Sequence, residues 1–537
     1  MKILAAAYAK LSGYSLVAGR AASGSQAGGF HAFWPLANCA DPSGFTFISA
    51  DDSAVDAACL QAESAFASHP ADAAVSDLLL ALAADLLTGE PELLAVAGRE
   101  TGLSRVRLAR EFARMIVTLK FFAGIARAGT WRELLHSPPL PVQSAGAFNT
   151  DLVRTNIALG PVAVFTASNF PFAYGVCGGD FASALACGCP VVIKGHPAHP
   201  ATGETLAGIV ARAIASRGLH AGMFSFLHAG GLRERDVGRE LLLHPAIRAS
   251  GFTGSVAGGE ALRHLVATER AHDPIPLFAE NGSCNLVLVC RNAAASRAPA
   301  IANAIVQSIV DSSGQQCTKP GIIAVETGGG GAQGTEAATI ASLIAVAFAG
   351  TAGRPMLSPR IADAYAARIN QSLNGQAKPV GPMHDGLRPA FAGTSARLLS
   401  ADIASILAER SLLDEIFGPA AVYTSGELSE LTRLVRASRG MLVASIFADQ
   451  ADAASVNALL PELASRSGRI VLNGVTTGVR VAPAMVHGGP HPATSAPFST
   501  AVGPLAARRW TRPICLQHVP GDPLAPVLLK LAGPRET

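Results

Sequence analysis

Charged residues are scarce in this sequence, and they form no runs of one sign. Only 15% of the 537 residues are Asp, Glu, Lys or Arg, and the formal net charge is +3. Nucleic acids and anionic membranes are bound through basic clusters, so we expect neither as a partner. Hydrophobic residues make up 49% of the chain. This balance favours a subunit that buries part of its surface against copies of itself.

The nine cysteines form no recognisable disulfide framework and no paired CxxC zinc pattern. Cys187 and Cys189 occupy alternate positions without further metal ligands nearby. We interpret them as small buried residues of a reduced protein. The sequence therefore predicts a cytoplasmic protein with no metal site.

No hydrophobic run is long enough to cross a membrane. A membrane-spanning helix needs about 20 apolar residues. The longest uncharged stretch, residues 155–179, is broken by Pro161, Pro171 and several glycines. The apolar run near the N-terminus is interrupted by Lys10, and no convincing cleavage site follows it. We expect neither a membrane span nor a secretory signal.

The chain is too long for a single hydrophobic core, since chains split into domains beyond about 250–300 residues. Residues 51–135 have helical periodicity, and Ser53 is the expected N-cap of the first helix. From residue 162 onward, short β-rich runs alternate with helical segments. A second alternating region starts at residue 284. This pattern predicts an α/β fold with parallel, doubly wound sheets that bind ligands at the carboxyl ends of their strands.

The segment SSGQQCTKP (312–320) places Cys317 after a predicted helix, in a polar turn. A cysteine is nucleophilic only as the thiolate, which needs polar and accessible surroundings. A lone cysteine is more often a buried structural residue. The neighbouring Gly, Gln and Thr residues weaken that interpretation, because they are poor neighbours for a core.

Two further segments place polar side chains beside predicted strands. In PLFAENGSCNLVLV (276–289), Glu280 is predicted at the start of a strand, between apolar residues. A carboxylate there either pairs structurally or has a raised pKa that suits a general base. In FTASNFPFAYG (165–175), Asn169 ends a strand, where its amide either stabilises an oxyanion or caps the next turn. From these residues alone, both alternatives stay open.

The segment GFTGSVAGGEAL (251–262) predicts a strand, a glycine turn and a helix. Such a turn presents backbone N–H groups and a helix dipole to a phosphate. The GxGxxG fingerprint of ordinary dinucleotide-binding folds is absent.

Six motifs occur in order along the chain: SNFP, VVIKGHPAHP, GFTGS, AENGS, GQQC and EIFGP. With them, the chain resembles the aldehyde dehydrogenase superfamily over nearly its whole length. The tail segments at 471–495 and 499–520 are similar to the branch of 2,5-dioxovalerate (α-ketoglutaric semialdehyde) dehydrogenases and NADP-dependent fatty aldehyde dehydrogenases.

The resemblance implies a catalytic role for three residues. Cys317 matches the nucleophile, which forms a thiohemiacetal, loses hydride to the nicotinamide and becomes a thioester. Glu280 matches the base that activates the hydrolytic water. Asn169, with the backbone N–H of Cys317, matches the oxyanion hole.

The resemblance also implies a set of residues that bind NAD or NADP. Lys194 matches the lysine that contacts the adenine ribose, and Ser255 matches a serine near the pyrophosphate. Glu415 matches the residue that holds the nicotinamide ribose, and Phe417 matches an aromatic residue beside the nicotinamide. Thr166 and His196 complete the set. The acidic residue common in this family three positions after the lysine is Pro197 here. Without this carboxylate, nothing repels the 2′-phosphate of NADP, so NADP is acceptable. His196 and His199 lie close by in the sequence and either support this or are only surface loop residues. Ser168 and Val256 also depart from the common pattern.

The implied architecture is α/β, with a Rossmann-type cofactor domain, a catalytic domain and a β oligomerisation flap. We expect residues 1–139 and 161–283 in the cofactor domain and 284–490 in the catalytic domain. Residues 140–160 and 491–537 form the flap, in which a hairpin at 147–160 combines with the strand near Ile514. Such pairing of edges would give a homodimer or a homotetramer.

Alternatives remain at the level of activity. A CoA-acylating enzyme needs no hydrolytic base, so Glu280 argues against it. A non-catalytic protein on the same fold would not need Cys317, Glu280 and Asn169 together. The predicted substrate is 2,5-dioxovalerate, with a fatty or broad-specificity aldehyde as the alternative. Arg480 is a candidate for the substrate carboxylate, or else a surface ion pair.

Overall fold

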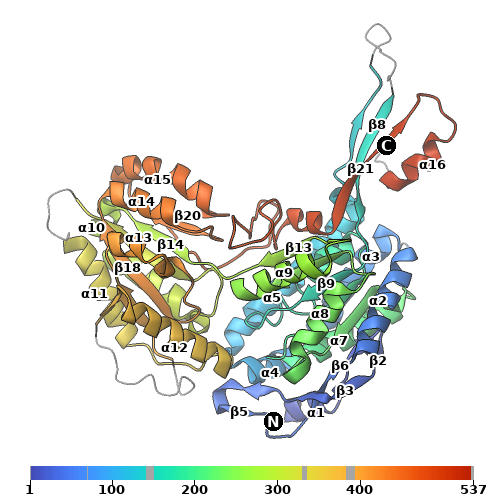
Figure 1. Ribbon diagram of the computed structural model, residues 1–537, viewed down its shortest axis with the longest axis horizontal. Helices are drawn as coiled ribbons and strands as arrows, with labels where there is room; N and C mark the ends of the chain where they lie inside the picture. The colour runs from blue at the N-terminus through green and yellow to red at the C-terminus, as the bar shows by residue number, and fades with distance from the viewer. Residues whose placement is uncertain (1, 69, 141–149, 329–334, 382–393, 534–537) are drawn as a thin grey trace.

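Two α/β lobes lie side by side in the computed structural model, and a β-arm projects from one of them (Figure 1). The structure describes residues 2–68, 70–140, 150–328, 335–381 and 394–533. None of the helices in these ranges combines the length and apolar character that a membrane span requires.

The first lobe is built on a seven-stranded sheet with the order β13-β12-β9-β10-β11-β1-β2. Its strands are β1 (Leu16–Val17), β2 (Arg20–Ala21), β9 (Val162–Phe165), β10 (Val191–Lys194), β11 (Phe224–Leu227), β12 (Ala249–Thr253) and β13 (Leu277–Glu280). The strands from β9 to β13 pair in parallel, and β1 and β2 add an antiparallel edge. The predicted parallel α/β arrangement is therefore confirmed for this lobe.

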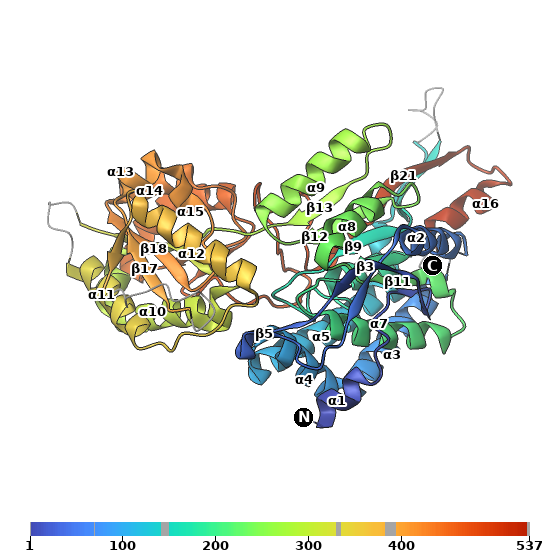
Figure 2. The same cartoon turned by 60° about the horizontal axis from the view of Figure 1, so that its bottom comes forward.

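Helices cover both faces of this sheet (Figure 2). They are α1 (Lys2–Tyr8), α2 (Asp52–Ala67), α3 (Asp72–Thr88), α4 (Glu90–Thr101), α5 (Arg105–Ala128), α6 (Gly179–Ala186), α7 (Pro200–Ala215), α8 (Glu234–Leu243) and α9 (Val256–Glu269). The predicted N-cap Ser53 is wrong. Asp51 caps α2 by accepting from the backbone N–H of Ala54, because it stands one position before the first helical residue.

Short strands and one-turn helices complete this lobe. They are β3 (Gly24–Phe30), β4 (Phe33–Trp34), β5 (Cys39–Ala40), β6 (Phe47–Ala50), η1 (Pro35–Ala37), η2 (Thr130–Arg132), η4 (Ala221–Met223) and η5 (Gly231–Arg233). Cys187 and Cys189 follow α6 and are buried, as predicted from their surroundings in the sequence.

The second lobe holds a seven-stranded sheet with the order β16-β17-β18-β15-β14-β19-β20. Its strands are β14 (Asn285–Val289), β15 (Pro320–Glu326), β16 (Lys378–Val380), β17 (Arg397–Ser400), β18 (Ala420–Gly426), β19 (Ala444–Phe447) and β20 (Ile470–Leu472). All neighbours pair in parallel except β16 with β17. The second alternating region of the sequence is thus a second parallel sheet.

Helices of the second lobe pack on both faces of that sheet, around two buried apolar clusters. They are α10 (Arg291–Val310), α11 (Thr335–Ala349), α12 (Pro359–Asn374), α13 (Ile403–Ala408), α14 (Leu428–Ala437) and α15 (Ala453–Arg466), with η6 (Asp311–Gly314), η7 (Arg410–Leu413) and η8 (Gln450–Asp452). The chain passes from the first sheet to the second between Glu280 and Asn285. The predicted division into three domains stays a prediction.

The β-arm is a three-stranded antiparallel sheet with the order β21-β8-β7. It contains β7 (Leu135–Ser137), β8 (Asp151–Ala158) and β21 (Thr511–His518), followed by α16 (Ala525–Leu529) and η10 (Lys530–Ala532); η9 (Pro504–Arg509) leads into it. Thr155 pairs with Ile514, as expected from the predicted combination of these segments. The start of the predicted hairpin, residues 147–149, lies outside the described residues, and 151–158 form a single strand.

Candidate active site

Cys317 lies in a strained turn that connects η6 to β15. Three residues of η6 shortly before it, Ser312, Ser313 and Gly314, have φ values of 56°, 54° and 66°. Two consecutive left-handed serines are costly, and such strain gathers at functional sites. A Cβ at Gly314 would lie 2.3 Å from the carbonyl carbon of Gly418. The close approach of these backbones therefore requires glycine and fixes the turn against the neighbouring loop.

The two glutamines before Cys317 hold this turn from inside. The Oε1 atom of Gln315 accepts from the backbone N–H of Leu357 at 2.9 Å. The Nε2 atom of Gln316 donates to Oδ2 of Asp311 at 3.1 Å. Both side chains are buried, whereas Cys317 is half-buried. The view of these residues as poor core neighbours was wrong, because their hydrogen bonds compensate their burial.

The structure brings Asn169 to the same turn. It lies in the loop after β9, and its Nδ2 atom donates to the backbone carbonyl of Gln315 at 2.9 Å. The amide therefore contacts the nucleophile's turn, two residues before Cys317. The strand itself ends earlier than predicted, at Phe165.

Three charged residues along one face of α5 hold the loop that carries Asn169. Arg107 donates to the backbone carbonyl of Asn169 at 3.1 Å and forms an ion pair with Glu111. Glu111 accepts from the backbone N–H groups of residues 172 and 173, both at 2.8 Å. Arg114 donates to the hydroxyl of Tyr174 at 2.8 Å. The sequence analysis missed this stripe, although the i, i+4, i+7 spacing in a mostly apolar helix is a signal for it.

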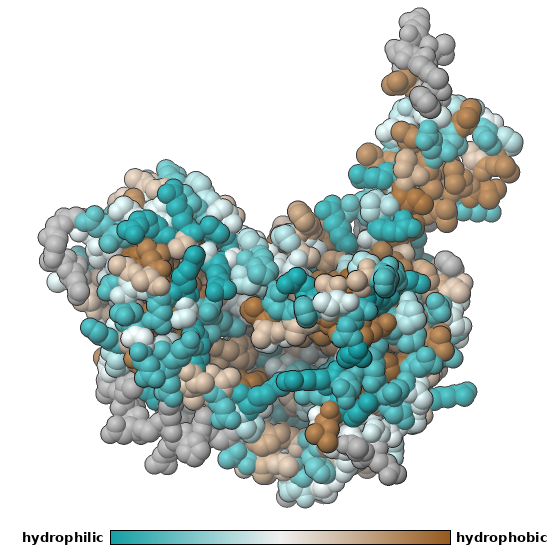
Figure 3. Space-filling model, in the orientation of Figure 1, coloured by the Kyte–Doolittle hydropathy of each residue, from teal (hydrophilic) through white to brown (hydrophobic). Residues whose placement is uncertain are grey.

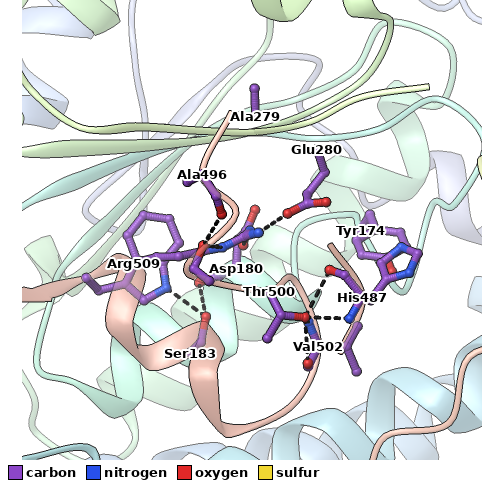
Figure 4. A network of polar contacts seen from close by, with 12 residues as sticks. Tyr174, Asp180, Ser183, Ala279, Glu280, His487, Ala496, Thr500, Val502 and Arg509 are labelled. Atoms are coloured by element: carbon purple, nitrogen blue, oxygen red, sulfur yellow. Dashed lines mark hydrogen bonds and ion pairs between the residues drawn. The ribbon is translucent and has the colours of Figure 1, made fainter. Parts of the chain in front are cut away.

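His487 contacts the nucleophile and was not predicted. Its Nε2 atom lies 3.9 Å from Sγ of Cys317, and its ring stacks on Tyr174 with centroids 6.0 Å apart. Its backbone N–H donates to Oγ1 of Thr500, which donates in turn to the carbonyl of His487 (Figure 4). Burial, followed by the charges of Arg114, Arg469 and Arg509, lowers the pKa of His487 to about 3. The ring is therefore neutral near pH 7 and only weakly basic.

The thiol of Cys317 is protonated in this arrangement. Burial, followed by the nearby charge of Glu415, raises its pKa to about 12, while the cation of Arg114 acts in the opposite direction. Thiolate formation thus requires a proton acceptor or added positive charge. Neutral His487 contacts the sulfur but is too weak a base to hold its proton, so the charge of Arg114 is the favourable influence on the thiolate.

Glu280 is the last residue of β13, so its predicted place at the start of a strand is wrong. β13 runs parallel to β12 at the edge of the first sheet, and the chain then leaves for the second lobe. The carboxylate is buried. Its Oε1 atom accepts from Arg509, and within the described residues Oε2 has no hydrogen-bond partner. A buried oxygen without a partner is poised to accept a proton from a substrate or a water.

The pKa of Glu280 is raised to about 7, first by burial and then by the carboxylate of Asp180, and Arg509 opposes the shift. Arg509 is itself fully buried and bonds Asp180 through Nη1 at 3.0 Å. Figure 4 shows this arginine between the two carboxylates, with Asp180 coming from α6. The arrangement fixes the position of Glu280 and keeps its protonation balanced near neutral pH. No local signal in the sequence identifies Asp180 or Arg509.

Three of the predicted cofactor residues lie at the carboxyl edge of the first sheet. β10 and β12 flank β9, and all three strands are parallel. Thr166 follows β9 and donates to the carbonyl of Lys194, the last residue of β10. Ser255 caps the N-terminus of α9 after β12, accepts from the N–H of Gly258 at 3.1 Å, and is exposed.

This edge fits a dinucleotide. The exposed first turn of α9 presents backbone N–H groups suited to a phosphate. Burial lowers the pKa of Lys194 to about 8, opposed by the charge of Glu234, and within the described ranges Lys194 forms no ion pair. A desolvated ammonium without a direct ion-pair partner is suited to the hydroxyls or phosphate of a ribose.

The two histidines near this edge differ from each other. His199 is buried and its Nε2 atom lies 2.8 Å from the carbonyl of Ala167, so the surface-loop alternative is wrong for it. His196 is half-buried, and its Nδ1 atom accepts from the N–H of Ala198 at 3.1 Å. Burial and the neighbouring cations place the pKa of His196 well below its usual range. His196 therefore offers a neutral ring, without a positive charge, near the ribose position.

Glu415 and Phe417 come from the second lobe, before β18. Glu415 lies against Gly282, where a Cβ would come 1.9 Å from its Oε2 atom. Burial raises the pKa of Glu415 to about 7, opposed by the cation of Lys319. Its Oε1 atom has no partner among the described residues. Phe417 is half-buried. Glu415 is thus close to the first lobe and near enough to Cys317 to influence its thiol.

Comparison with known proteins identifies the class. Residues 44–491 match the aldehyde dehydrogenase family, which is most of the chain. The chain therefore belongs to the aldehyde dehydrogenase family and is an oxidoreductase that uses NAD or NADP. The predicted family and fold class are confirmed.

Two curated relatives are similar over nearly their full length. Alpha-ketoglutaric semialdehyde dehydrogenase 2 of Azospirillum brasilense is 37% identical, covering 98% of both chains. Alpha-ketoglutaric semialdehyde dehydrogenase of Acinetobacter baylyi is 36% identical over 92% of this chain and 91% of the relative. The crystal structure of the aldehyde dehydrogenase KauB from Pseudomonas aeruginosa has a TM-score of 0.79 at 20% identity, covering 95% of this chain and 97% of KauB. That last likeness supports the fold alone.

Proposed function

We propose that this enzyme oxidises 2,5-dioxovalerate to 2-oxoglutarate, with Cys317 as nucleophile and Glu280 as the base of the hydrolytic step. The arrangement that carries the proposal joins two lobes. A half-buried thiol touches a neutral histidine, an amide reaches the thiol's turn, and a carboxylate from the other lobe has a free oxygen. The substrate is proposed from the two curated relatives, which are named for this aldehyde.

In the first step, Cys317 adds to the aldehyde carbon. The thiol loses its proton to solvent water as the sulfur attacks, because His487, with a pKa of about 3, is too weak a base to hold it, and the charge of Arg114 stabilises the thiolate. The oxygen of the resulting thiohemiacetal becomes negative, and the amide of Asn169 with the N–H of Cys317 stabilises it. Arg107 and Glu111 support this step indirectly by holding the loop of Asn169.

Bound NAD or NADP supplies the hydride acceptor that converts the thiohemiacetal into a thioester. The residues that would hold it are Thr166, Lys194, His196 and Ser255 on the first lobe and Glu415 and Phe417 on the second. Because these groups come from both lobes, a bound cofactor would be held by residues of both.

In the last step, Glu280 accepts a proton from water, and the water oxygen attacks the thioester carbon. The carbon–sulfur bond then breaks and Cys317 leaves as thiolate. A pKa near 7 lets Glu280 take the proton at neutral pH and release it again. Free acid, and not acyl-CoA, is the expected product.

The cofactor preference is proposed to include NADP. Pro197 provides no carboxylate to repel a 2′-phosphate. The charge of Arg360, in α12 of the second lobe, acts on both Lys194 and His196. Two cations near the adenine ribose favour a phosphate there, while the absence of a strong discriminating group leaves NAD acceptable.

The β-arm supports a homo-oligomer as the working form. Its surface gathers hydrophobic side chains, as Figure 3 shows on the projecting arm. Exposed apolar residues there include Leu135, Leu152, Val519, Leu524 and Val527. Contiguous exposed apolar surface of this kind marks an interaction site, and a second copy of the chain is the proposed partner, in a dimer or a tetramer.

The test is turnover of purified enzyme with 2,5-dioxovalerate and with a long-chain fatty aldehyde, each with NAD and NADP. Product analysis in the presence of CoA distinguishes free acid from acyl-CoA. Preferred oxidation of 2,5-dioxovalerate to the free acid is expected. Equal or faster turnover of the fatty aldehyde would reject the substrate, and acyl-CoA formation would reject the hydrolytic step.

A further inference from the structure

Two arginines near Cys317 have no carboxylate partner. Within the described residues, Arg114 donates to the hydroxyl of Tyr174 at 2.8 Å and forms no ion pair. Arg469, just before β20, donates to the backbone carbonyls of Thr476 at 2.7 Å and Gly478 at 2.8 Å, again without an ion pair in those ranges. Both side chains are only partly exposed. A partly desolvated guanidinium is normally compensated by an anion.

Arg114 is connected to the nucleophile through two aromatic side chains. Its guanidinium carbon lies 5.1 Å from the centre of the Tyr174 ring. That ring stacks on His487 at 6.0 Å, and His487 lies 3.9 Å from Sγ of Cys317. Figure 4 shows the Tyr174 and His487 rings together at one side of the site. Arg114 thus lies at the far end of a short row of side chains that begins at the sulfur.

Arg469 belongs to the same group. Burial lowers its pKa, and the nearby cation of Arg114 lowers it further, while Tyr174 and Cys317 act in the opposite direction. Both arginines also contribute to the lowered pKa of His487. The two guanidiniums therefore act on the same three side chains, and they repel each other when no anion is present.

The substrate chain is short, which suits a pair of arginines close enough to act on the Cys317 thiol. In 2,5-dioxovalerate the carboxylate carbon is four bonds from the aldehyde carbon, about 5 Å in an extended chain. The charges of Arg114 and Arg469 both act on the Cys317 thiol, so both guanidiniums lie on the side of the site that a chain of this length can explore from the sulfur. Guanidinium groups recognise carboxylates through paired, charge-assisted hydrogen bonds.

We propose that Arg114 and Arg469 together bind the carboxylate at the far end of the aldehyde substrate. This inference rests on the proposed function, because only a substrate with a terminal carboxylate needs such a receptor. It differs from the expectation drawn from the sequence, which pointed to Arg480. Arg480 is exposed, while its neighbours Val479 and Val481 pack in the apolar cluster that contains Tyr174.

The experiment compares 2,5-dioxovalerate with pentanal, which has the same number of carbons and no charge. The variants are Arg114→Met, Arg469→Met and the two combined, with Arg114→Lys as a charge-conserving form and Arg480→Met as the rival position. Arg105→Met, an exposed position at the start of the same helix, is the matched control. Inhibition of pentanal oxidation by 2-oxoglutarate is measured in parallel, as a binding readout that needs no turnover of the charged substrate.

Each single Met variant is expected to lower kcat/KM for 2,5-dioxovalerate by roughly 10- to 100-fold, mainly through KM. Pentanal turnover should fall less than turnover of 2,5-dioxovalerate, because Arg114 also holds Tyr174 and lowers the pKa of the Cys317 thiol. Inhibition by 2-oxoglutarate should weaken, and the Lys variant should recover part of the loss. Retained preference for the acid in both Met variants would overturn the proposal, as would an equal loss for both substrates. A loss confined to Arg480→Met would also overturn it, in favour of Arg480.

The proposed function is judged separately, from the wild-type enzyme. If wild type oxidises 2,5-dioxovalerate no better than pentanal, the substrate assignment fails, whatever the variants do. If wild type prefers the acid and the arginine variants keep that preference, only the carboxylate receptor fails.

Discussion

Arginines occupy two contrasting environments around the candidate active site. Arg509 is fully buried and binds the carboxylates of Asp180 and Glu280. Arg114 and Arg469 are partly exposed and bind only a hydroxyl and backbone carbonyls within the described residues. The first arginine is compensated by the protein itself, and its position is fixed. The second pair is left uncompensated, as expected of a site whose anion arrives with the substrate.

This difference in environment indicates that arginines have two different functions in this enzyme. At Arg509, the cation organises the base and tunes its pKa. At Arg114 and Arg469, the cations are available to bind the carboxylate of the substrate. Removing a compensated arginine should therefore damage folding and base chemistry, while removing an uncompensated one should damage mainly recognition of a charged substrate.

The largest effect is expected at the carboxylate on the compensated side. Glu280→Gln keeps an oxygen for Arg509 but cannot accept a proton, so thioester hydrolysis should slow. Steady-state turnover should fall by about 10²- to 10⁴-fold. A rapid first-turnover burst of NAD(P)H should persist in stopped-flow absorbance, because the hydride step precedes hydrolysis. Loss of the burst together with turnover would mean that Glu280 acts earlier.

The second prediction concerns stability. Arg509→Met leaves Asp180 and Glu280 buried without a counter-charge, which should lower the free energy of unfolding by about 3–5 kcal/mol. Arg114→Met should lower it by only about 1–2 kcal/mol, since it loses a hydrogen bond to Tyr174 but no ion pair. Urea denaturation of both variants measures the contrast. Similar losses in the two proteins would break the distinction between the two environments.

The third prediction concerns pH. Glu280 must be deprotonated to act as a base, and burial raises its pKa to about 7. Turnover should therefore fall about tenfold per pH unit below that value when hydrolysis limits the rate. Because Arg509 lowers this pKa, Arg509→Met should move the acid limb to higher pH, and Arg114→Met should leave it in place. An acid limb that persists in Glu280→Gln would assign it to another group.

Much of the fold could be predicted from the sequence, and so could the residues nearest the chemistry. The alternation of β-rich and helical segments predicted both parallel sheets, because burial on two faces imposes a strong pattern. The motifs singled out Cys317, Glu280 and Asn169, and the structure places Asn169 at the turn of Cys317. The roles assigned to these residues stay predictions.

The supporting residues were beyond prediction for a physical reason. Arg509 meets Glu280 across 229 positions of the chain, and His487 meets Cys317 across 170. Neither position carries a local signal, because only the fold of the C-terminal segment back across both lobes creates these contacts. Glu280 was placed at the wrong end of a strand, since the apolar residues on both sides of it allow either reading.

The smallest effect is expected at a third uncompensated arginine. Arg360, on α12, is exposed and forms no ion pair within the described residues, yet its charge acts on Lys194 and His196. Arg360→Gln should raise KM for NADP by about fivefold, the scale of an exposed charge pair. KM for NAD should stay unchanged, because NAD has no 2′-phosphate for the arginine to attract.

Arg360→Lys is the control for this last change, since it keeps the charge and should keep most of the affinity for NADP. The difference in KM for NADP between wild type and Arg360→Gln should also shrink as salt is added, because an exposed interaction is screened. By the same reasoning, the effect of Arg114→Met on 2,5-dioxovalerate should depend less on salt, since that arginine is partly buried. An equal shift of KM for NAD and NADP in Arg360→Gln would show that Arg360 has a structural role and does not interact with the 2′-phosphate.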